Sequence, residues 1–177
     1  DARSFCGFLP ETNLISFFCS PDISCSIEAV NSLSNLLPQT QLDDLAIIVR
    51  PHPRAPKKYL LDEQARQFRH VLYDHGEELS TPSLLTVSRF SLSMASTVSL
   101  ESLVIGTPSA FYQIGWDYST MDTLYSNVTT ISRIRTKDEL DNFVNRLSKN
   151  GKQPKGENIE FHKGALTRTW KSILELI

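Results

Sequence analysis

The residues best suited to chemistry are Ser96 and Thr97, two hydroxyl side chains that follow the apolar-rich run 90–95 and precede a helical pattern. This order of strand, tight turn and helix places both hydroxyls at a helix start. A helix start presents backbone N–H groups without intrahelical partners at the positive end of the helix dipole, so it suits an anion, most often a phosphate. Ser96 or Thr97 could instead be N-caps that satisfy those N–H groups themselves. The sequence leaves both roles open.

A second candidate group follows the run 45–49, LAIIV, which predicts a buried strand. The next five residues read RPHPR, and their two prolines fix the backbone and exclude a helix. His52 is therefore held rigidly just past a strand end, which is where open α/β sheets bind ligands. Arg50 and Arg54 flank it with positive charge. The motif predicts a ligand-contacting histidine, and the alternative is a proline-rich connection with an exposed histidine.

An aromatic loop, QIGWDY at 113–118, follows the short apolar run 109–112. Its rings, Trp116 among them, could wall a base or sugar pocket. They could equally pack onto the sheet or onto a partner, because aromatic side chains bury large apolar areas.

Short strands alternating with helices are needed to position these groups. Continuous apolar runs bounded by turn residues predict strands covered on both faces, as in a parallel sheet. We predict strands at 14–19, 45–49, 70–73, 90–95, 109–112 and 129–134, and helices at 26–37, 59–69, 82–88, 98–105 and 159–177, with a further helix opened by the capping box at 136–139. The alternation predicts an α/β fold, a Rossmann-like doubly wound parallel sheet flanked by helices. The whole chain, 1–177, forms one domain with C-terminal helices from about 136 to 177.

Composition narrows the function classes. Of the 177 residues, 40% are hydrophobic and 21% are charged, as expected for a soluble globular domain. The 18 basic and 20 acidic residues give a net charge of −2, so the composition predicts no nucleic-acid partner. No apolar run approaches the about 20 residues of a membrane span. The cysteine count is three, with no metal-ligand spacing, which favours a reduced, cytosolic setting and a core role for Cys19.

Two sequence motifs that bind metals or dinucleotide cofactors are absent after the predicted strands. No Asp-x-Asp follows a predicted strand, so we expect no metal site. No G-x-G-x-x-G follows any strand either, which argues against an ordinary dinucleotide-binding domain.

The R-P-H-P turn, followed by S-x-A-S-T-x-x-x-E-S-x-x-x-G-x-P at 93–108, resembles the C-terminal, donor-nucleotide-binding domain of GT-B glycosyltransferases. The most similar patterns belong to bacterial sialyl- and polysialyltransferases and to the CDP-glycerol glycerophosphotransferases of surface-polysaccharide assembly. The nucleotide-sugar 2-epimerases share the architecture. The resemblance spans about 14–134.

The resemblance implies a role for each matching residue. His52 would contact the donor phosphate or the charge that develops on the leaving nucleotide, where fixed donors stabilise a transition state. Ser96 and Thr97 would hold the phosphates together with the helix start, and Glu101 would accept hydrogen bonds from the ribose. Glu101 could also be a solvated helix residue. The remaining members of the predicted site are Arg50 and Arg54, as phosphate contacts, and Trp116, as a wall of the cleft.

The chain departs from the family in two respects. Such enzymes usually carry a preceding Rossmann-like domain that binds the acceptor, so we expect an upstream acceptor-binding domain to be missing and this half to be inactive alone. The Gly-Gly pair of the epimerases is replaced by Ala-Ser-Thr at 95–97, which argues against an epimerase.

The first hypothesis is the nucleotide-sugar-binding domain of a glycosyltransferase in surface-glycan assembly, acting in the cytoplasm at the inner face of the membrane. Its substrate would be a CMP-, CDP- or UDP-linked sugar, with no cofactor and no metal. One alternative is a polyol-phosphate transferase of the CDP-glycerol type. Another is a non-catalytic Rossmann-like module used in regulation or assembly.

Overall fold

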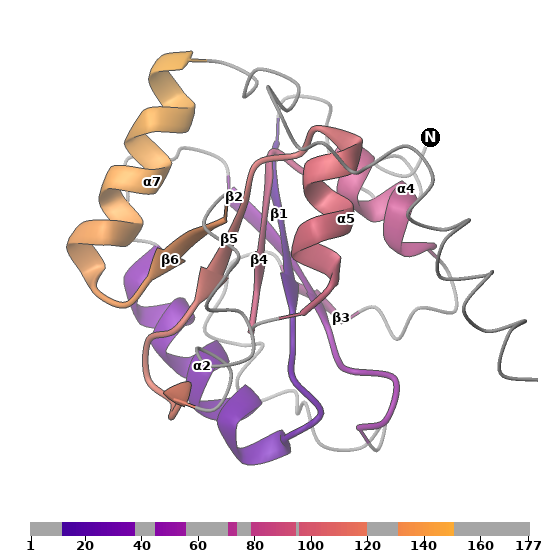
Figure 1. The fold of residues 1–177 in the computed structure, drawn as a ribbon, viewed down its shortest axis with the longest axis vertical. Helices are drawn as coiled ribbons and strands as arrows, with labels where there is room; N and C mark the ends of the chain where they lie inside the picture. Colours follow the sequence, from indigo (N-terminus) through magenta and orange to yellow (C-terminus); the bar gives the residue numbers. More distant parts are fainter. Residues whose placement is uncertain are drawn as a thin grey trace, which may run out of the picture.

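A parallel sheet organises the protein (Figure 1). The computed structural model describes residues 12–37, 45–55, 71–73, 79–94, 96–119 and 131–150. The described strands are β1 (Asn13–Phe18), β2 (Leu45–Arg50), β3 (Val71–Tyr73), β4 (Phe90–Ser93), β5 (Ser109–Tyr112) and β6 (Ser132–Ile134), and the helices are α2 (Ile23–Leu36), α4 (Thr81–Val87), α5 (Val98–Ile105) and α7 (Lys137–Asn150). The helices predicted at 59–69 and 159–177 lie outside the described residues.

The order of the strands is β3-β2-β1-β4-β5-β6, and every pair is parallel. From β1 the chain builds outward through β2 and β3, then returns to the other side of β1 and continues through β4 to β6. The predicted Rossmann-like doubly wound sheet is therefore confirmed. In such sheets the point where the strand order reverses, here between β1 and β4, opens a crevice at the carboxyl ends of the strands.

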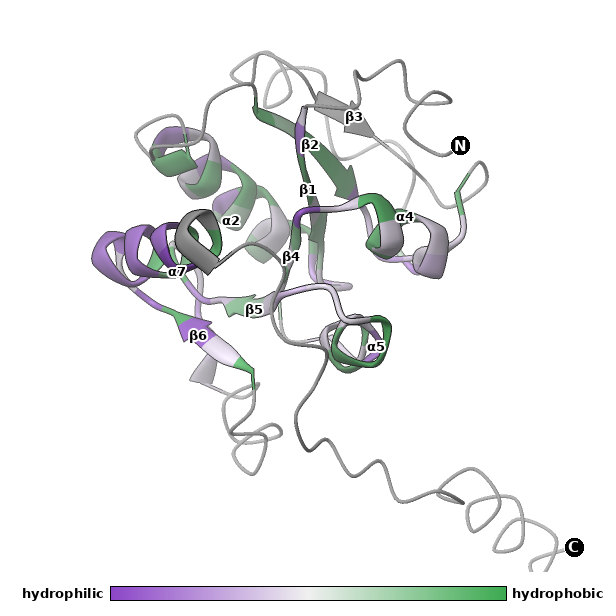
Figure 2. Ribbon diagram, turned by 90° about the horizontal axis from the view of Figure 1, so that it is seen from above, coloured by the Kyte–Doolittle hydropathy of each residue, from purple (hydrophilic) through white to green (hydrophobic). Residues whose placement is uncertain are grey.

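Helices cover both faces of the sheet, with α2 and α7 on one side and α4 and α5 on the other (Figure 2). The α2/α7 side is the larger apolar core. Phe17 lies edge-on to Tyr112 with ring centroids 5.7 Å apart, and Phe90 lies edge-on to Phe143 of α7 at 5.5 Å. Burial of these rings holds α7 on the sheet through Phe143, since aromatic side chains bury large apolar areas, and α2 joins the same core through Ala29, Val30 and Leu33.

The contact between β4 and α5 is built from serines instead. The Ser91 hydroxyl lies 2.8 Å from that of Ser102, and the Ser93 hydroxyl lies 2.7 Å from that of Ser99, with all four side chains buried. Each hydroxyl thus has a buried partner, which satisfies its hydrogen-bonding capacity. Such small side chains also let the helix backbone approach the strand closely.

As a result, α5 turns some of its apolar residues outward. The helical pattern at 98–105 contains five apolar positions, yet Val104 is 65% exposed while Ser99 and Ser102 are fully buried. Val98 and Ile105 reach the apolar cluster of the α4 side from the edges of the helix. Hydrogen bonding by the serines of β4, and not apolarity alone, selects the inward face of this helix. None of the described helices is both long and apolar enough to cross a membrane.

We expect Ser102→Leu to lower the free energy of unfolding by about 1–3 kcal/mol, because it overpacks the β4–α5 contact and leaves the Ser91 hydroxyl without its partner. The exposed Val104→Ser change should cost less than about 0.5 kcal/mol. Urea denaturation followed by circular dichroism measures both. Equal losses in the two variants would show that the helix packs through a different face.

Candidate functional site

Three turns meet at the carboxyl edge of the sheet, which faces the lower side of Figure 1. They follow β1, β2 and β4 at residues 19–22, at residues 51–55, and at residue 94 with 96–97. Because β1 lies between β2 and β4, and neighbouring strands are about 4.8 Å apart, the outer two turns are separated by about 10 Å along the edge. That span is short enough for one ligand to touch all three turns.

Backbone hydrogen bonds join these turns into one unit. The Cys19 N–H donates to the Arg50 carbonyl at 3.0 Å, and the Met94 N–H donates to the Phe18 carbonyl at 3.0 Å. Both bonds continue the ladder to the very end of the strands, so the turns are held in a defined relative position. Cys19 itself is buried, as predicted, and burial raises the pKa of its thiol to about 12, which makes it unsuitable as a nucleophile.

His52 lies in the turn after β2 with its ring partly exposed. Its Nδ1 accepts a hydrogen bond from the Arg54 backbone N–H at 3.1 Å, and its carbonyl accepts one from the Ala55 N–H at 2.8 Å. Partial burial, together with the positive charge of Arg54, lowers the pKa of His52. The neutral form of the ring therefore predominates at pH 7. Since Nδ1 is an acceptor, the proton sits on Nε2, which makes Nε2 a hydrogen-bond donor.

The start of α5 is the second component. Thr97 is exposed at the N-cap position, and its side chain makes no cap hydrogen bond. Ser96 takes part of the capping role, because its Oγ accepts from the Val98 N–H at 3.3 Å. The Ser96 N–H in turn donates to Ser93 Oγ at 3.4 Å. Ser96 is thus a weak cap, whereas Thr97 lies at the surface and its ligand-binding role stays a prediction.

The start of α2, which follows the neighbouring strand β1, differs from the start of α5 in the charge of its cap residue. Asp22 Oδ1 accepts hydrogen bonds from the Cys25 N–H at 3.0 Å and the Ser24 hydroxyl at 2.7 Å. These bonds lower the pKa of Asp22, so a carboxylate already occupies this helix start. At α5 no carboxylate fills the cap position itself. The carboxylate nearest the start of α5 is that of Glu101, in the first turn, so the two helix starts differ in whether the cap position itself is charged.

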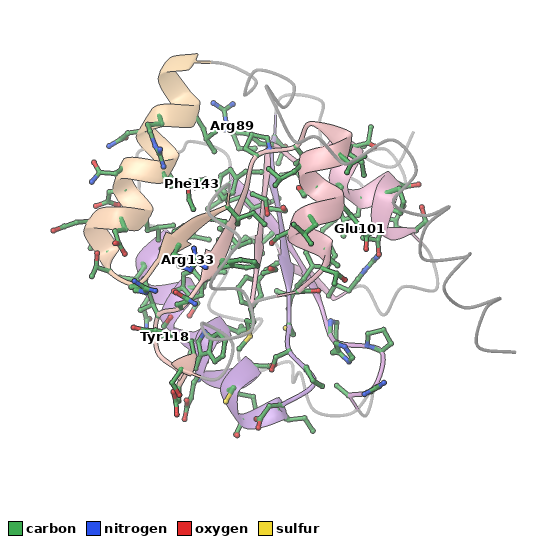
Figure 3. All side chains as sticks on the ribbon, viewed as in Figure 1. Arg89, Glu101, Tyr118, Arg133 and Phe143 are labelled. Carbon is green, nitrogen blue, oxygen red and sulfur yellow. The ribbon has the colours of Figure 1, made fainter. Side chains whose placement is uncertain are left out.

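Glu101 lies one turn into α5 and is exposed (Figure 3). Its backbone N–H donates to the Thr97 carbonyl at 3.1 Å, which places it directly behind the helix start. An exposed carboxylate here suits hydrogen bonding to a ligand hydroxyl and also suits simple solvation.

The two predicted arginines have different surroundings. Arg54 is exposed beside His52. Arg50 is only 8% exposed; its Nη2 donates to the Leu79 carbonyl at 2.6 Å and its Nη1 to Thr81 Oγ1 at 3.1 Å. Its guanidinium also lies over the Phe18 ring at 5.9 Å. This differs from the predicted phosphate contact, because the guanidinium is directed at the segment that starts α4.

Trp116 also differs from its predicted place as a cleft wall. It is 9% exposed, and its Nε1–H donates to the Tyr112 carbonyl at 2.9 Å, so the ring belongs to the apolar core beside α2. Close packing of the loop continues at Gly115, where a Cβ would lie 2.9 Å from Ser32 Cβ. The packing role of the aromatic loop therefore replaces the pocket role for this ring.

One polar cluster at the same edge was not predicted from the sequence. Arg135 Nε, just past β6, donates to Gln113 Oε1 at 3.1 Å, and its guanidinium lies over the Tyr118 ring at 5.5 Å. The signal available was that Gln113 and Arg135 each come directly after a predicted strand. Within the described ranges, no three His, Cys, Asp or Glu side chains are grouped so as to hold a metal ion.

The comparisons with known proteins concern the fold. No family profile matches the sequence, and no curated protein matches it. Among solved structures, UDP-GlcNAc 2-epimerase from Neisseria meningitidis bound to UDP-GlcNAc is similar with a TM-score of 0.62 and 13% identity, over 98% of this chain and 47% of that one. The S. aureus MnaA–UDP complex is similar with a TM-score of 0.57 and 16% identity, over 100% of this chain and 49% of that one.

These likenesses identify the fold as one Rossmann-like half of a GT-B-like architecture, as predicted. The chain spans about half the length of each of these proteins. At such low identity the likeness does not extend to sialyltransferases or CDP-glycerol transferases in particular.

We expect His52 to titrate below its ordinary value of about 6.5 and to carry its proton on Nε2 in the neutral form. Because the unfolded chain then binds the proton more tightly, the contribution of His52 to stability is present above pH 6.5 and is lost as the pH falls through the lowered value. A pH titration of the imidazole by NMR measures both properties. Arg54→Gln should raise the midpoint, and a wild-type midpoint at or above 6.5 would contradict this account.

We expect Gly115→Ala to lower the free energy of unfolding by about 1–3 kcal/mol, since an alanine there is strained at a positive φ and collides with Ser32. Gly115 has φ +82°, and Ser32 binds both the Tyr112 hydroxyl and the Ile114 carbonyl. The control is Asp117→Ala in the same loop, because the Asp117 side chain is exposed. Thermal unfolding measures the stability of both variants. A loss no larger than that of the control would show that the loop does not pack tightly on α2.

Proposed function

We propose that this domain binds the nucleoside phosphate part of a nucleotide-sugar at the carboxyl edge of β1, β2 and β4. The observation that carries the proposal is the α5 start, which lies at the reversal of strand order and lacks the carboxylate cap found at α2. A helix start of this kind presents the positive end of the helix dipole to a phosphate, while the N–H groups of Val98, Ser99 and Leu100 already donate to Ser96 and Thr97. Both solved neighbours hold a uridine nucleotide, which supports the same ligand class.

The roles follow from the surroundings of each side chain. Thr97, exposed at the α5 start, donates its hydroxyl to a phosphate oxygen. His52 approaches from the other side of β1 and donates from Nε2, while Arg54 adds positive charge beside it. Glu101, one turn behind Thr97, accepts from the ribose hydroxyls. Arg50 and Trp116 are left out of the ligand contacts because both are buried.

The reaction that suits this arrangement is transfer of the sugar by direct displacement at its anomeric carbon. The bond from that carbon to the phosphate oxygen breaks, and negative charge grows on the departing nucleotide. A fixed N–H donor at His52 and the α5 start oppose that charge without a metal ion. This chain would supply the donor half of such a glycosyltransferase, and a further domain would supply the acceptor site.

The residues at 95–97 are the feature that favours transfer over epimerisation, because the epimerase-type Gly-Gly pair is replaced by Ala-Ser-Thr. Transfer of a polyol phosphate would use the same phosphate contacts with a different electrophile. In that reaction the pyrophosphate bond of a CDP-linked donor breaks and CMP leaves, so a cytidine nucleotide is expected to bind, whereas binding of UDP or GDP alone would favour sugar transfer.

The test is a calorimetric or NMR titration with UDP, CMP, CDP and GDP up to millimolar concentrations, where binding of about −4 kcal/mol is measurable. We expect one nucleotide to bind, and His52→Ala and Thr97→Ala each to weaken it about tenfold, the effect of losing one hydrogen bond to a charged group. Thr86→Ala, which removes an exposed threonine hydroxyl on α4, is the matched control and should leave the affinity unchanged. Absence of binding, or equal losses in all three variants, would overturn the assignment.

A further inference from the structure

We infer that Arg50 is a positioning residue that sets the orientation of the His52 ring, and that its contribution to ligand binding, which rests on the proposed function, passes through His52. Both the side-chain contacts of Arg50 and its place in the chain support this role. Its guanidinium is buried among contacts of its own and would not touch the ligand.

The guanidinium links the end of β2 to two other parts of the fold beneath the carboxyl edge. It donates to the Leu79 carbonyl and to the Thr81 hydroxyl, which lie at the start of α4. It also lies over the ring of Phe18, the last residue of β1. A charged group so deeply buried is tolerated only when such partners are present, so the position of the side chain is closely defined.

The backbone of Arg50 continues this connection into the turn. Its carbonyl accepts from the Cys19 N–H at the end of β1, and its own chain leads through Pro51 into His52. Proline restricts the backbone of the residue before it as well as its own, so little freedom remains between Arg50 and the imidazole. The last adjustable angle, that of the ring, is fixed by the Arg54 N–H bond to Nδ1.

Arginine is suited to this task and lysine is not. A planar guanidinium can donate to a carbonyl and a hydroxyl at once while its face lies over an aromatic ring. A lysine ammonium is a point charge and cannot make the same three contacts together. Arg50→Lys therefore keeps the charge but releases the Phe18–Leu79–Thr81 arrangement.

A second arginine provides the matched control. Arg89 is partly buried at the opposite, amino-terminal edge, where Nη1 donates to Asn13 Oδ1 at 2.9 Å and Nη2 to the Leu147 carbonyl at 3.4 Å. In Figure 3 it lies near the C-terminal end of α7, away from the turns of the candidate site. Arg89→Lys should therefore lower stability without affecting His52.

The first measurement uses the ligand-free domain, so it does not depend on the proposed function. We expect Arg50→Lys to shift the imidazole ¹⁵N and Hε1 NMR signals of His52 toward those of a mixture of the two neutral tautomers. Arg89→Lys should leave these signals in place. Thr81→Val, which keeps Arg50 but removes one of its partners, should move the signals in the same direction by less, and it covers the case in which Arg50→Lys fails to fold.

The second measurement is UDP affinity in a double-mutant cycle. We expect Arg50→Lys to weaken binding about tenfold in the wild-type background and to have no further effect when His52→Ala is present, because residues acting through one group are non-additive. Additive losses, or His52 signals unchanged in both Arg50→Lys and Thr81→Val, would overturn the inference. If wild-type protein binds no nucleotide, the proposed function fails, and the tautomer signals still decide the role of Arg50.

Discussion

The rest of the structure depends on the hydrogen-bond ladder that places β1 between β2 and β4. Ile15, Ser16 and their neighbours pair with β2 on one side and with β4 on the other. This double pairing brings His52 and Thr97, which are 45 residues apart in the chain (97 − 52), to one edge. Bonds from Cys19 to Arg50 and from Met94 to Phe18 carry the ladder to the strand ends. Without this ladder, His52 and Thr97 would have no defined relation to each other.

The helices on the two faces of the sheet are held by different interactions, and this difference affects the turn at the carboxyl edge. On the α2/α7 face, aromatic and aliphatic side chains supply burial. On the α5 face, hydroxyl pairs between β4 and α5 position the helix, and one of them joins Ser93 to Ser99 within the first turn. Ser93 Oγ also accepts from the Ser96 N–H. The same small polar contacts therefore hold both the helix and the turn from which Thr97 projects.

The starts of α2 and α5, which follow the neighbouring strands β1 and β4, differ in charge at their cap positions. Asp22 neutralises the dipole of α2 from within the chain, whereas the cap position of α5 is filled by an uncharged Thr97. Across β1, a neutral His52 is held with its Nε2–H as a donor by a bond from its own turn. An anion at this edge would meet fixed donors whose orientation is set before it binds, which lowers the cost of reorganisation.

Within the described residues, the sequence by itself determined the strands and helices, because continuous apolar runs such as 45–49 and the proline and glycine breaks between runs act locally. It also predicted the parallel sheet and the edge where His52 and Thr97 lie. The surroundings of Arg50 and Trp116 depended on contacts with Leu79 and with the core beside α2, which are distant in the chain, so only the tertiary structure decided that both side chains are buried. The inward face of α5 was decided in the same way, since its apolar residues compete with serines whose partners lie on β4. Local periodicity records which side chains are apolar, whereas long-range packing decides which of them find a partner.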